Sequence, residues 1–89
     1  MSTLEVKTFI EDWCPTCQKV APGLLNLESR YNTKLSWQNL NTDQHGGTYE
    51  VGAIPTVIFV KDGVEVERMV GERPAFLYEE TILKYLFKR

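Results

Sequence analysis

The segment Trp13-Cys14-Pro15-Thr16-Cys17 contains both cysteines of this 89-residue chain. It stands where an alternating apolar pattern gives way to a helical one, so Cys14 falls at the start of a predicted helix. The N terminus of a helix presents unpaired backbone N–H groups and the positive end of the helix dipole, and both stabilise a thiolate. The segment therefore predicts a redox-active dithiol in which Cys14 is the nucleophile.

The two-residue spacing gives Cys17 a separate role. One helical turn after Cys14, its thiol is close enough to attack the mixed disulfide that forms when Cys14 opens a substrate disulfide, and this attack releases the reduced substrate. Pro15 suits the first helical turn because no N–H is needed there. A zinc site is disfavoured because the single histidine, His45, has no second cysteine pair near it. A structural disulfide around so short a loop would stabilise the fold little.

The composition is that of one globular domain, which we expect to span residues 1–89. Hydrophobic residues make up 43% and charged residues 25%, and the formal net charge is −2, so no surface for nucleic acid or an anionic membrane is expected. The N terminus lacks a basic and then apolar leader, and no apolar run approaches the roughly 18 residues of a membrane span. These features predict no membrane partner and a cytoplasmic location, where a cysteine pair is more often catalytic or metal-bound than a structural disulfide.

The first half of the chain predicts a strand, a helix and a second strand. Residues 4–11 alternate between apolar and polar, and Phe9 adds an apolar side chain on the second face, as in a strand covered on both sides. Residues 15–31 repeat apolar side chains at helical spacing, and Pro22 should kink this helix. Residues 35–40 then form a strand parallel to the first. The helical stripe comprises Val20, Leu24, Leu27 and Tyr31, widened by Ala21 and Leu25.

The second half predicts a hairpin and a final helix. Residues 41–53 are loop-like with a short helix near Tyr49, and residues 56–60 form a strand that turns at Lys61-Asp62-Gly63 into an antiparallel strand over residues 64–70. The order βαβ(α)ββα predicts an α/β fold with a four-stranded mixed sheet whose faces the first and last helices cover. The last helix is expected to begin at Pro74, with Ala75, Tyr78, Ile82, Tyr85 and Leu86 toward the core and with Lys84, Lys88 and Arg89 near its C-terminal end.

Three motifs in this order resemble the thioredoxin family over nearly the whole chain. They are the C-x-x-C after the first strand, Ile54-Pro55-Thr56 before the third strand, and Val70-Gly71 after the hairpin. The resemblance implies the thioredoxin fold, without the family's leading strand and helix, and a thiol-disulfide oxidoreductase that reduces protein disulfides. It also implies that no cofactor is bound, that a Cys14–Cys17 disulfide is the redox-active group, and that a reductase is the electron donor. A small domain that presents its dithiol to other proteins is expected to be a monomer.

The resemblance also implies roles for residues around the dithiol. Pro55 becomes a cis-proline that faces the cysteines, and the backbone of Ile54 pairs with an extended substrate segment. On the residues alone, Trp13 also suits a partly buried core aromatic, and Pro55 an ordinary trans proline. The residues that match the family's apolar contact surface are Trp13, Ala53, Val70 and Gly71, and Pro15 and Thr16 between the cysteines complete the site.

The chain departs from the family's pattern at the dithiol. Pro15-Thr16 replaces the usual Gly-Pro, and Thr8 stands where the family has a buried acid that assists removal of the proton of the resolving cysteine. Gln18 replaces a common lysine, and Glu11-Asp12 add negative charge that opposes a thiolate, whereas the helix dipole and the Thr16 hydroxyl favour one. We therefore expect a weaker reductant than a Gly-Pro thioredoxin, with slower resolution by Cys17.

Three other functions stay open on the sequence alone. A glutaredoxin-like protein normally needs basic residues beside the dithiol and a Gly-Gly with a following Asp, where this chain has Val70-Gly71-Glu72-Arg73. A ribonucleotide reductase redoxin has a similar length. The chain could also be a thioredoxin-fold binding module, in which the dithiol is incidental and the apolar surface near Trp13 and Ile54 holds a partner.

Overall fold

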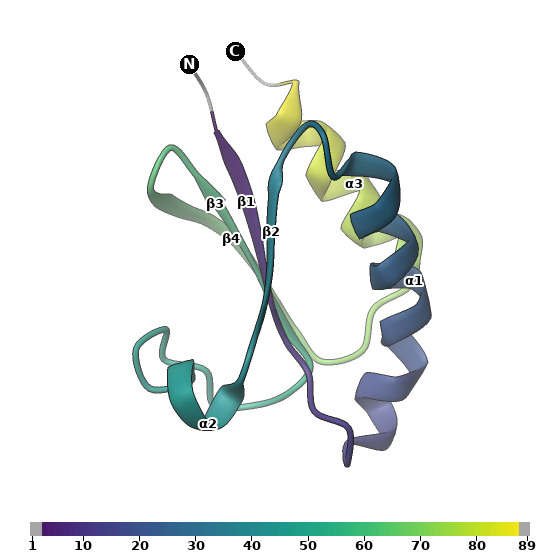
Figure 1. Cartoon of the computed structure of the whole chain (residues 1–89), viewed down its shortest axis with the longest axis vertical. Coiled ribbons are helices and arrows are strands. Elements are labelled where there is room, and N and C mark those ends of the chain that lie inside the picture. Colours follow the sequence, from purple (N-terminus) through teal and green to yellow (C-terminus); the bar gives the residue numbers. More distant parts are fainter. Residues whose placement is uncertain (1–2, 88–89) are drawn as a thin grey trace.

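The computed structural model describes residues 3–87 and contains the predicted elements in the predicted order (Figure 1). The four strands form one mixed sheet, as expected from the sequence. Three helices accompany it within the described residues. The elements are β1 (Leu4–Phe9), α1 (Pro15–Tyr31), β2 (Ser36–Leu40), α2 (Thr42–His45), β3 (Thr56–Lys61), β4 (Val64–Val70) and α3 (Ala75–Leu86).

The strands lie in the order β2-β1-β3-β4. β1 is parallel to β2 and antiparallel to β3, and β3 is antiparallel to β4. The hairpin turn is Asp62-Gly63, with φ of +51° and +84°, which is the backbone that favoured two-residue hairpin turns require. Lys61, predicted to lie in the turn, is the last residue of β3. Because β1 is a central strand, its C-terminal end brings the cysteine segment to one end of the sheet.

The two long helices, α1 and α3, lie on the same face of the sheet, and α2 lies on the opposite face (Figure 1). The expectation that the first and last helices would cover both faces is therefore corrected. The physical reason is that both helices bury their apolar stripes in one shared core. That core comprises Leu4, Val6, Val20, Leu24, Leu27, Leu35, Val57, Phe59, Tyr78, Ile82 and Tyr85.

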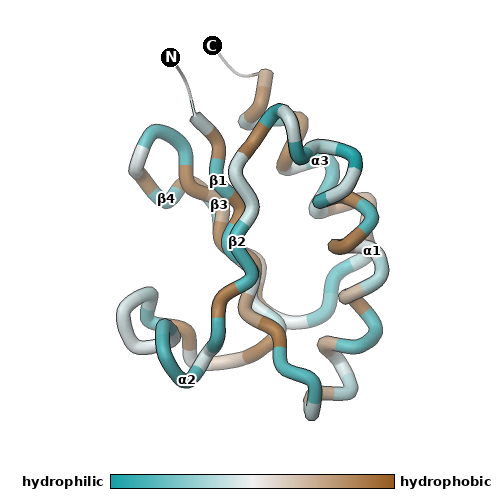
Figure 2. Tube along the Cα trace, viewed as in Figure 1, coloured by the Kyte–Doolittle hydropathy of each residue, from teal (hydrophilic) through white to brown (hydrophobic). Residues whose placement is uncertain are grey.

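A second, smaller core fills the other face of the sheet. Successive strand residues point to opposite faces, so Phe9 and Ile58 lie here while their neighbours in sequence face the long helices. β1 is thus covered on both sides near its end, as predicted. Figure 2 shows α2 as hydrophilic, so the cover on this face comes mainly from the segment that follows α2. The residues packed around Phe9, Ile58 and Val60 are Leu40, Tyr49, Val51 and Ile54.

Some local predictions from the sequence differ from the structure. The helix over residues 15–31 has the predicted bounds, but Leu25 is 67% exposed, so it lies outside the buried stripe. Ala75 is likewise exposed at the start of α3. The short helix lies at Thr42–His45 and not near Tyr49, because the side chain of Asn41 caps it. The kink at Pro22 stays a prediction.

Lys84 lies in the last turn of α3, as expected. The predicted helix charges Lys88 and Arg89 fall outside the described residues. Between residues 3 and 87 no helix combines the length and the apolar character that crossing a membrane would need.

Candidate active site

The dithiol lies where the chain leaves β1 and enters α1. Cys14 is the N-cap of α1 and Pro15 its first residue, so the predicted start of the helix is confirmed. The Sγ of Cys14 accepts a hydrogen bond from the backbone N–H of Cys17 at 3.1 Å. The Cys14 N–H donates to the carbonyl of Glu11 at 3.2 Å. The Cys14 sulfur therefore occupies the position of a capping acceptor at the N terminus of α1.

The two cysteines differ in their surroundings. Both are free thiols, Cys14 is 5% exposed, and Cys17 is completely buried. Burial, together with a hydrogen bond to Cys14, raises the pKa of Cys17 to about 11. The backbone of Glu11 acts in the opposite direction but does not outweigh burial. Cys17 is thus held as a thiol at neutral pH.

At the buried position of Thr8 the chain has a hydroxyl group and not a carboxylate. Thr8 is 1% exposed, and its hydroxyl donates a hydrogen bond to Oδ1 of Asn39. The same Oδ1 accepts from the indole N–H of Trp37 at 3.1 Å. A neutral hydroxyl whose proton is already committed cannot serve as the base that Cys17 would need. The expected departure at this position therefore leaves the buried thiol without a nearby buried acid.

Gln18 and Glu11 hold the loop before α1. The Gln18 side-chain amide lies 3.4 Å from the carbonyl of Glu11 and 3.3 Å from that of Asp12, and it donates to both. The Glu11 carboxylate accepts from the backbone N–H of Thr42 at 2.9 Å, which ties the loop to the start of α2. The charge of Glu11 also contributes to the raised pKa of Cys17, although it is the smallest cause. The Thr16 hydroxyl, expected to support the thiolate, makes no hydrogen bond within residues 3–87.

Pro55 connects the entrance of β3 with the end of β4. The Ile54–Pro55 peptide bond is cis, as the resemblance implied. The Pro55 carbonyl accepts from the backbone N–H of Gly71 at 2.7 Å. Gly71 has a φ of +88°, a conformation that side chains other than glycine rarely adopt. The Thr56 hydroxyl closes the turn before β3 by donating to the carbonyl of Ala53 at 2.6 Å.

A groove of about 200 Å³ adjoins the cysteine segment. Its lining includes Trp13, Ala53 and Ile54. Trp13 is 76% exposed, which excludes the partly buried core aromatic considered from the sequence. Val70 is also well exposed, but it does not line this groove. The structure therefore brings Trp13, Ala53 and Ile54 together around an open surface, and it links Gly71 to them through Pro55.

Some residues near the dithiol had no signal in the sequence. Glu11 was noted only as a nearby charge, and its contact with α2 depends on the tertiary fold. Lys19, Glu72 and Tyr78 line a second pocket, between α1 and the loop before α3. Lys19 and Glu72 are far apart in the chain and belong to no motif, so only the packing of α3 against α1 reveals them. Within the described part of the chain, no three His, Cys, Asp or Glu side chains are grouped to hold a metal ion.

Comparisons with known proteins agree with this architecture. The thioredoxin family model matches residues 2–84. A thioredoxin of Staphylococcus aureus is 35% identical over 88 residues, which cover 96% of this chain and 85% of that protein. The M-type chloroplastic thioredoxin of Spinacia oleracea is 36% identical over 81 residues, 88% of this chain and 45% of that protein. The X-ray structure of Fasciola hepatica thioredoxin superimposes with a TM-score of 0.82 at 30% identity, covering 93% of this chain and 81% of that one.

Proposed function

Because the chain belongs to the thioredoxin family of thiol-disulfide oxidoreductases, we propose that it reduces disulfides of other proteins and that Cys14 and Cys17 carry the reaction. The observation that supports this most strongly is the position of Cys14. Its sulfur caps α1, accepts the Cys17 N–H, and lies in the segment that borders an open groove. This arrangement favours attack by Cys14 on a disulfide presented at the surface.

The proposed reaction has two steps. The Cys14 thiolate attacks one sulfur of the substrate disulfide, so a Cys14–substrate bond forms, the substrate S–S bond breaks, and the leaving thiolate takes a proton from solvent. Cys17 then loses its proton and attacks the Cys14 sulfur, which forms the Cys14–Cys17 disulfide and releases the second substrate thiol. The two electrons pass from the dithiol to the substrate, so the redox-active disulfide is the only carrier that the proposal needs, and no bound cofactor enters.

Substrate docking is proposed along the Ile54 backbone. Among the described residues this backbone makes no hydrogen bond, and Ile54 lies between Ala53 and the buried Pro55. An extended substrate segment can pair with such a free main chain regardless of its sequence. Trp13, Ala53, Val70 and Gly71 would supply apolar contact, while Pro15 and Thr16 shape the surface between the cysteines.

Members of this family act on disulfide substrates and receive electrons from a reductase. We propose the same for this chain, with protein disulfides as substrates and with each chain acting as a monomer, because one chain contains both cysteines and the whole groove. The single domain over residues 1–89 and the cytoplasmic location stay predictions. The spinach relative is named chloroplastic.

Insulin reduction with dithiothreitol tests this function. The wild-type protein should accelerate precipitation of the insulin B chain, and Cys14→Ser should abolish the acceleration. Lys34→Gln, a change at an exposed position away from the dithiol, serves as the matched control and should leave the rate unchanged. No acceleration by the wild type, together with partner binding retained in a Cys14→Ser, Cys17→Ser double variant, would instead support a binding module.

A further inference from the structure

The solvent side of α3 carries three large apolar side chains. Phe76 is 61% exposed, Leu83 is 38% exposed, and Phe87, the C-cap of the helix, is 65% exposed. The backbone N–H of Phe87 donates to the carbonyl of Leu83 at 3.2 Å, so the helical hydrogen-bond pattern continues to this residue. Within the described residues, α3 and its C-cap thus expose more large apolar side chains than any other element.

These three side chains lie in one row along the helix. Leu83 and Phe87 follow Phe76 by seven and eleven residues, which is close to two and three turns of about 3.6 residues each. Residues at this spacing point in nearly the same direction. We call the row of Phe76, Leu83 and Phe87 the outer stripe. The buried residues of α3, which lie on the opposite side of the helix, are Tyr78, Thr81, Ile82 and Tyr85.

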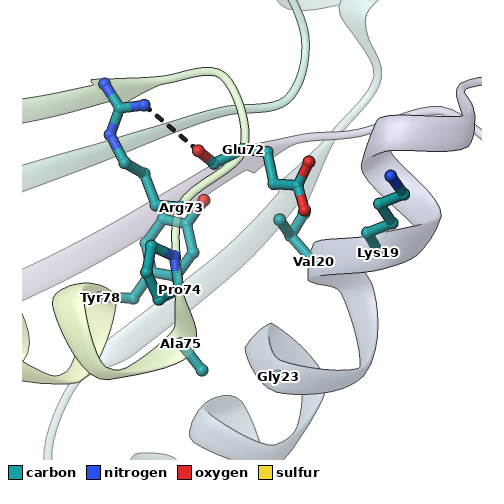
Figure 3. Close-up of a pocket in the computed structure, with 8 residues that line it drawn as sticks. All are labelled: Lys19, Val20, Gly23, Glu72, Arg73, Pro74, Ala75 and Tyr78. Carbon is teal, nitrogen blue, oxygen red and sulfur yellow. Dashed lines mark hydrogen bonds between the residues drawn. The ribbon is translucent and has the colours of Figure 1, made fainter.

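The inner side of α3 is already covered by the rest of the fold. Figure 3 shows the start of the helix beside α1, where a Cβ added to Gly23 would lie 3.1 Å from the Cβ of Ala75. Tyr78, in the same view, is 1% exposed. The outer stripe has no comparable cover among residues 3–87. An exposed apolar group that is continuous along one helix is typical of an interaction surface.

Two opposite charges flank the outer stripe on one side. Glu80 and Lys84 are exposed and one helical turn apart, a spacing that favours an ion pair within a helix. Neither takes part in an ion pair among residues 3–87. Both line a hollow of about 330 Å³ whose other residues include Met69 of β4, so they lie on the side of the stripe that faces β4. A carboxylate and an ammonium therefore follow one another along this flank.

We propose that the outer stripe binds the outer stripe of a second copy of this chain, with the two α3 helices antiparallel. A twofold axis makes such an interface self-complementary. The reversed direction brings Phe76 against the partner subunit's Phe87, and the axis then passes between positions 81 and 82. Leu83 lies close to this axis, so it meets the partner subunit's Leu83.

The flanking charges fit the same arrangement. The twofold axis keeps the β4 sides of the two helices together, so Glu80 faces the partner subunit's Lys84. Their distances from the axis differ by one residue, or about 1.5 Å along the helix. The symmetry repeats the pair, so the interface contains two such ion pairs. This charge complementarity is the reason to assign the stripe to a second copy, since each chain supplies both the carboxylate and the ammonium that the other needs.

The length of α3 limits the strength of the dimer. Its 12 residues span about 18 Å at about 1.5 Å per residue. A contact of this length buries less than the roughly 1,200 Å² at which stable interfaces begin. We therefore expect a reversible dimer with a dissociation constant on the order of 100 µM. The outer stripe contains none of the residues assigned to the disulfide reaction, so the catalytic unit stays one chain.

Sedimentation equilibrium of the whole protein tests the dimer, with a phosphine reductant present so that no intermolecular disulfide contributes. Between about 10 µM and 1 mM the mass of the wild type should rise from 10.3 kDa toward twice that value. Phe76→Ser and Phe87→Ser should each raise the dissociation constant at least about tenfold, because each removes an apolar contact twice. Leu25→Ser is the matched control, because Leu25 is 67% exposed on α1, and it should leave the constant unchanged.

Charge reversal tests the antiparallel arrangement. Glu80→Lys and Lys84→Glu each place like charges opposite one another, so each variant alone should dimerise about three- to tenfold more weakly than the wild type. An equimolar mixture of the two variants should recover the association, because opposite charges then face one another in the mixed dimer. Lys34→Glu, a charge reversal at an exposed position outside α3, should have no effect.

Three outcomes would overturn the inference. A wild type that stays at 10.3 kDa up to about 1 mM would exclude the dimer. An equal loss of association in Leu25→Ser and in the two phenylalanine variants would show that the outer stripe is not the interface. A mixture of Glu80→Lys and Lys84→Glu that associates no better than either variant alone would exclude the antiparallel pairing. The proposed dithiol function is independent of all three, because insulin reduction needs only one chain.

Discussion

Cys14 and Cys17 belong to one short motif but occupy different environments. The Cys14 sulfur caps α1 and accepts a backbone N–H, whereas the Cys17 thiol lies completely buried one turn later with a pKa of about 11. The spacing of the motif assigns the order of attack. Both thiols are buried, but only the Cys14 sulfur accepts a backbone N–H, and the pKa of Cys17 is raised. Since only the thiolate is a nucleophile, we expect Cys14 to react more readily than Cys17.

The comparison predicts that resolution by Cys17 is the slower step of this dithiol. In the thioredoxin pattern a buried acid assists the resolving cysteine, but Thr8 stands at that position and donates its proton to Asn39. Among residues 3–87, Thr8 therefore offers no carboxylate at that position to take the proton of Cys17. We expect Cys14 to attack rapidly and Cys17 to resolve slowly, and the predictions below test each half of this contrast.

Substitution of the two cysteines should have the largest effect. Cys14→Ser removes the nucleophile and should lower insulin reduction by about 10³-fold or more, to the rate of dithiothreitol alone. Cys17→Ser leaves the attack intact, so it should accumulate a Cys14–substrate mixed disulfide, visible by mass spectrometry as a covalent adduct. Adduct formation in Cys14→Ser rather than in Cys17→Ser would reverse the assigned roles.

The pH dependence of resolution should show the next largest effect. Because the pKa of Cys17 is raised above neutral pH, its thiolate fraction increases about tenfold for each pH unit below that pKa. Burial is the main cause and persists in the mixed disulfide. Decay of a preformed mixed disulfide should therefore accelerate about 100-fold between pH 7 and pH 9. A rate that is independent of pH over this range would show that another group already removes the proton.

Thr8→Asp should supply the missing base and accelerate resolution at pH 7 by about tenfold, toward the lower end of what a positioned base provides. Burial of the carboxyl should also destabilise the fold by about 1–3 kcal/mol. Thr8→Asn is the matched control, because it has a similar shape and loses the same hydroxyl but cannot take up a proton. Equal rates for the two variants would contradict the role assigned to the position.

Glu11→Gln should have the smallest effect. Its negative charge raises the pKa of Cys17 only slightly, so its removal should accelerate resolution about twofold at pH 7. The amide can still accept the N–H of Thr42, which keeps α2 in place. Asp12→Asn, a neighbouring exposed change that does not affect the pKa of Cys17, should leave the rate as it is. A slower rate in Glu11→Gln would mean that Glu11 itself assists proton removal.

The sequence predicted those features that depend on local patterns. The bounds of α1 follow from the spacing of Val20, Leu24 and Leu27 and from the suitability of Pro15 for a first turn. The resemblance added the cis bond before Pro55. The position of α2 was misjudged although Asn41, a good N-cap residue, precedes it and accepts from two backbone N–H groups.

Features that depend on tertiary packing could not be predicted. The placement of α1 and α3 on one face, and the pocket with Lys19 and Glu72 that this placement creates, join residues far apart in the chain. The exposure of Leu25 is of the same kind, because its spacing alone fits the edge of the apolar stripe. The raised pKa of Cys17 depends on how deeply the completed fold buries its thiol, which the motif does not encode.

Rapid-quench mass spectrometry of the wild-type protein at pH 7, with a peptide disulfide as substrate, tests the central contrast most directly. It measures formation and decay of the mixed disulfide in one experiment and identifies the cysteine that carries the substrate. We predict an adduct on Cys14 that forms faster than it decays, so that it accumulates before Cys17 resolves it. An adduct on Cys17, or decay so fast that no adduct accumulates, would contradict the account.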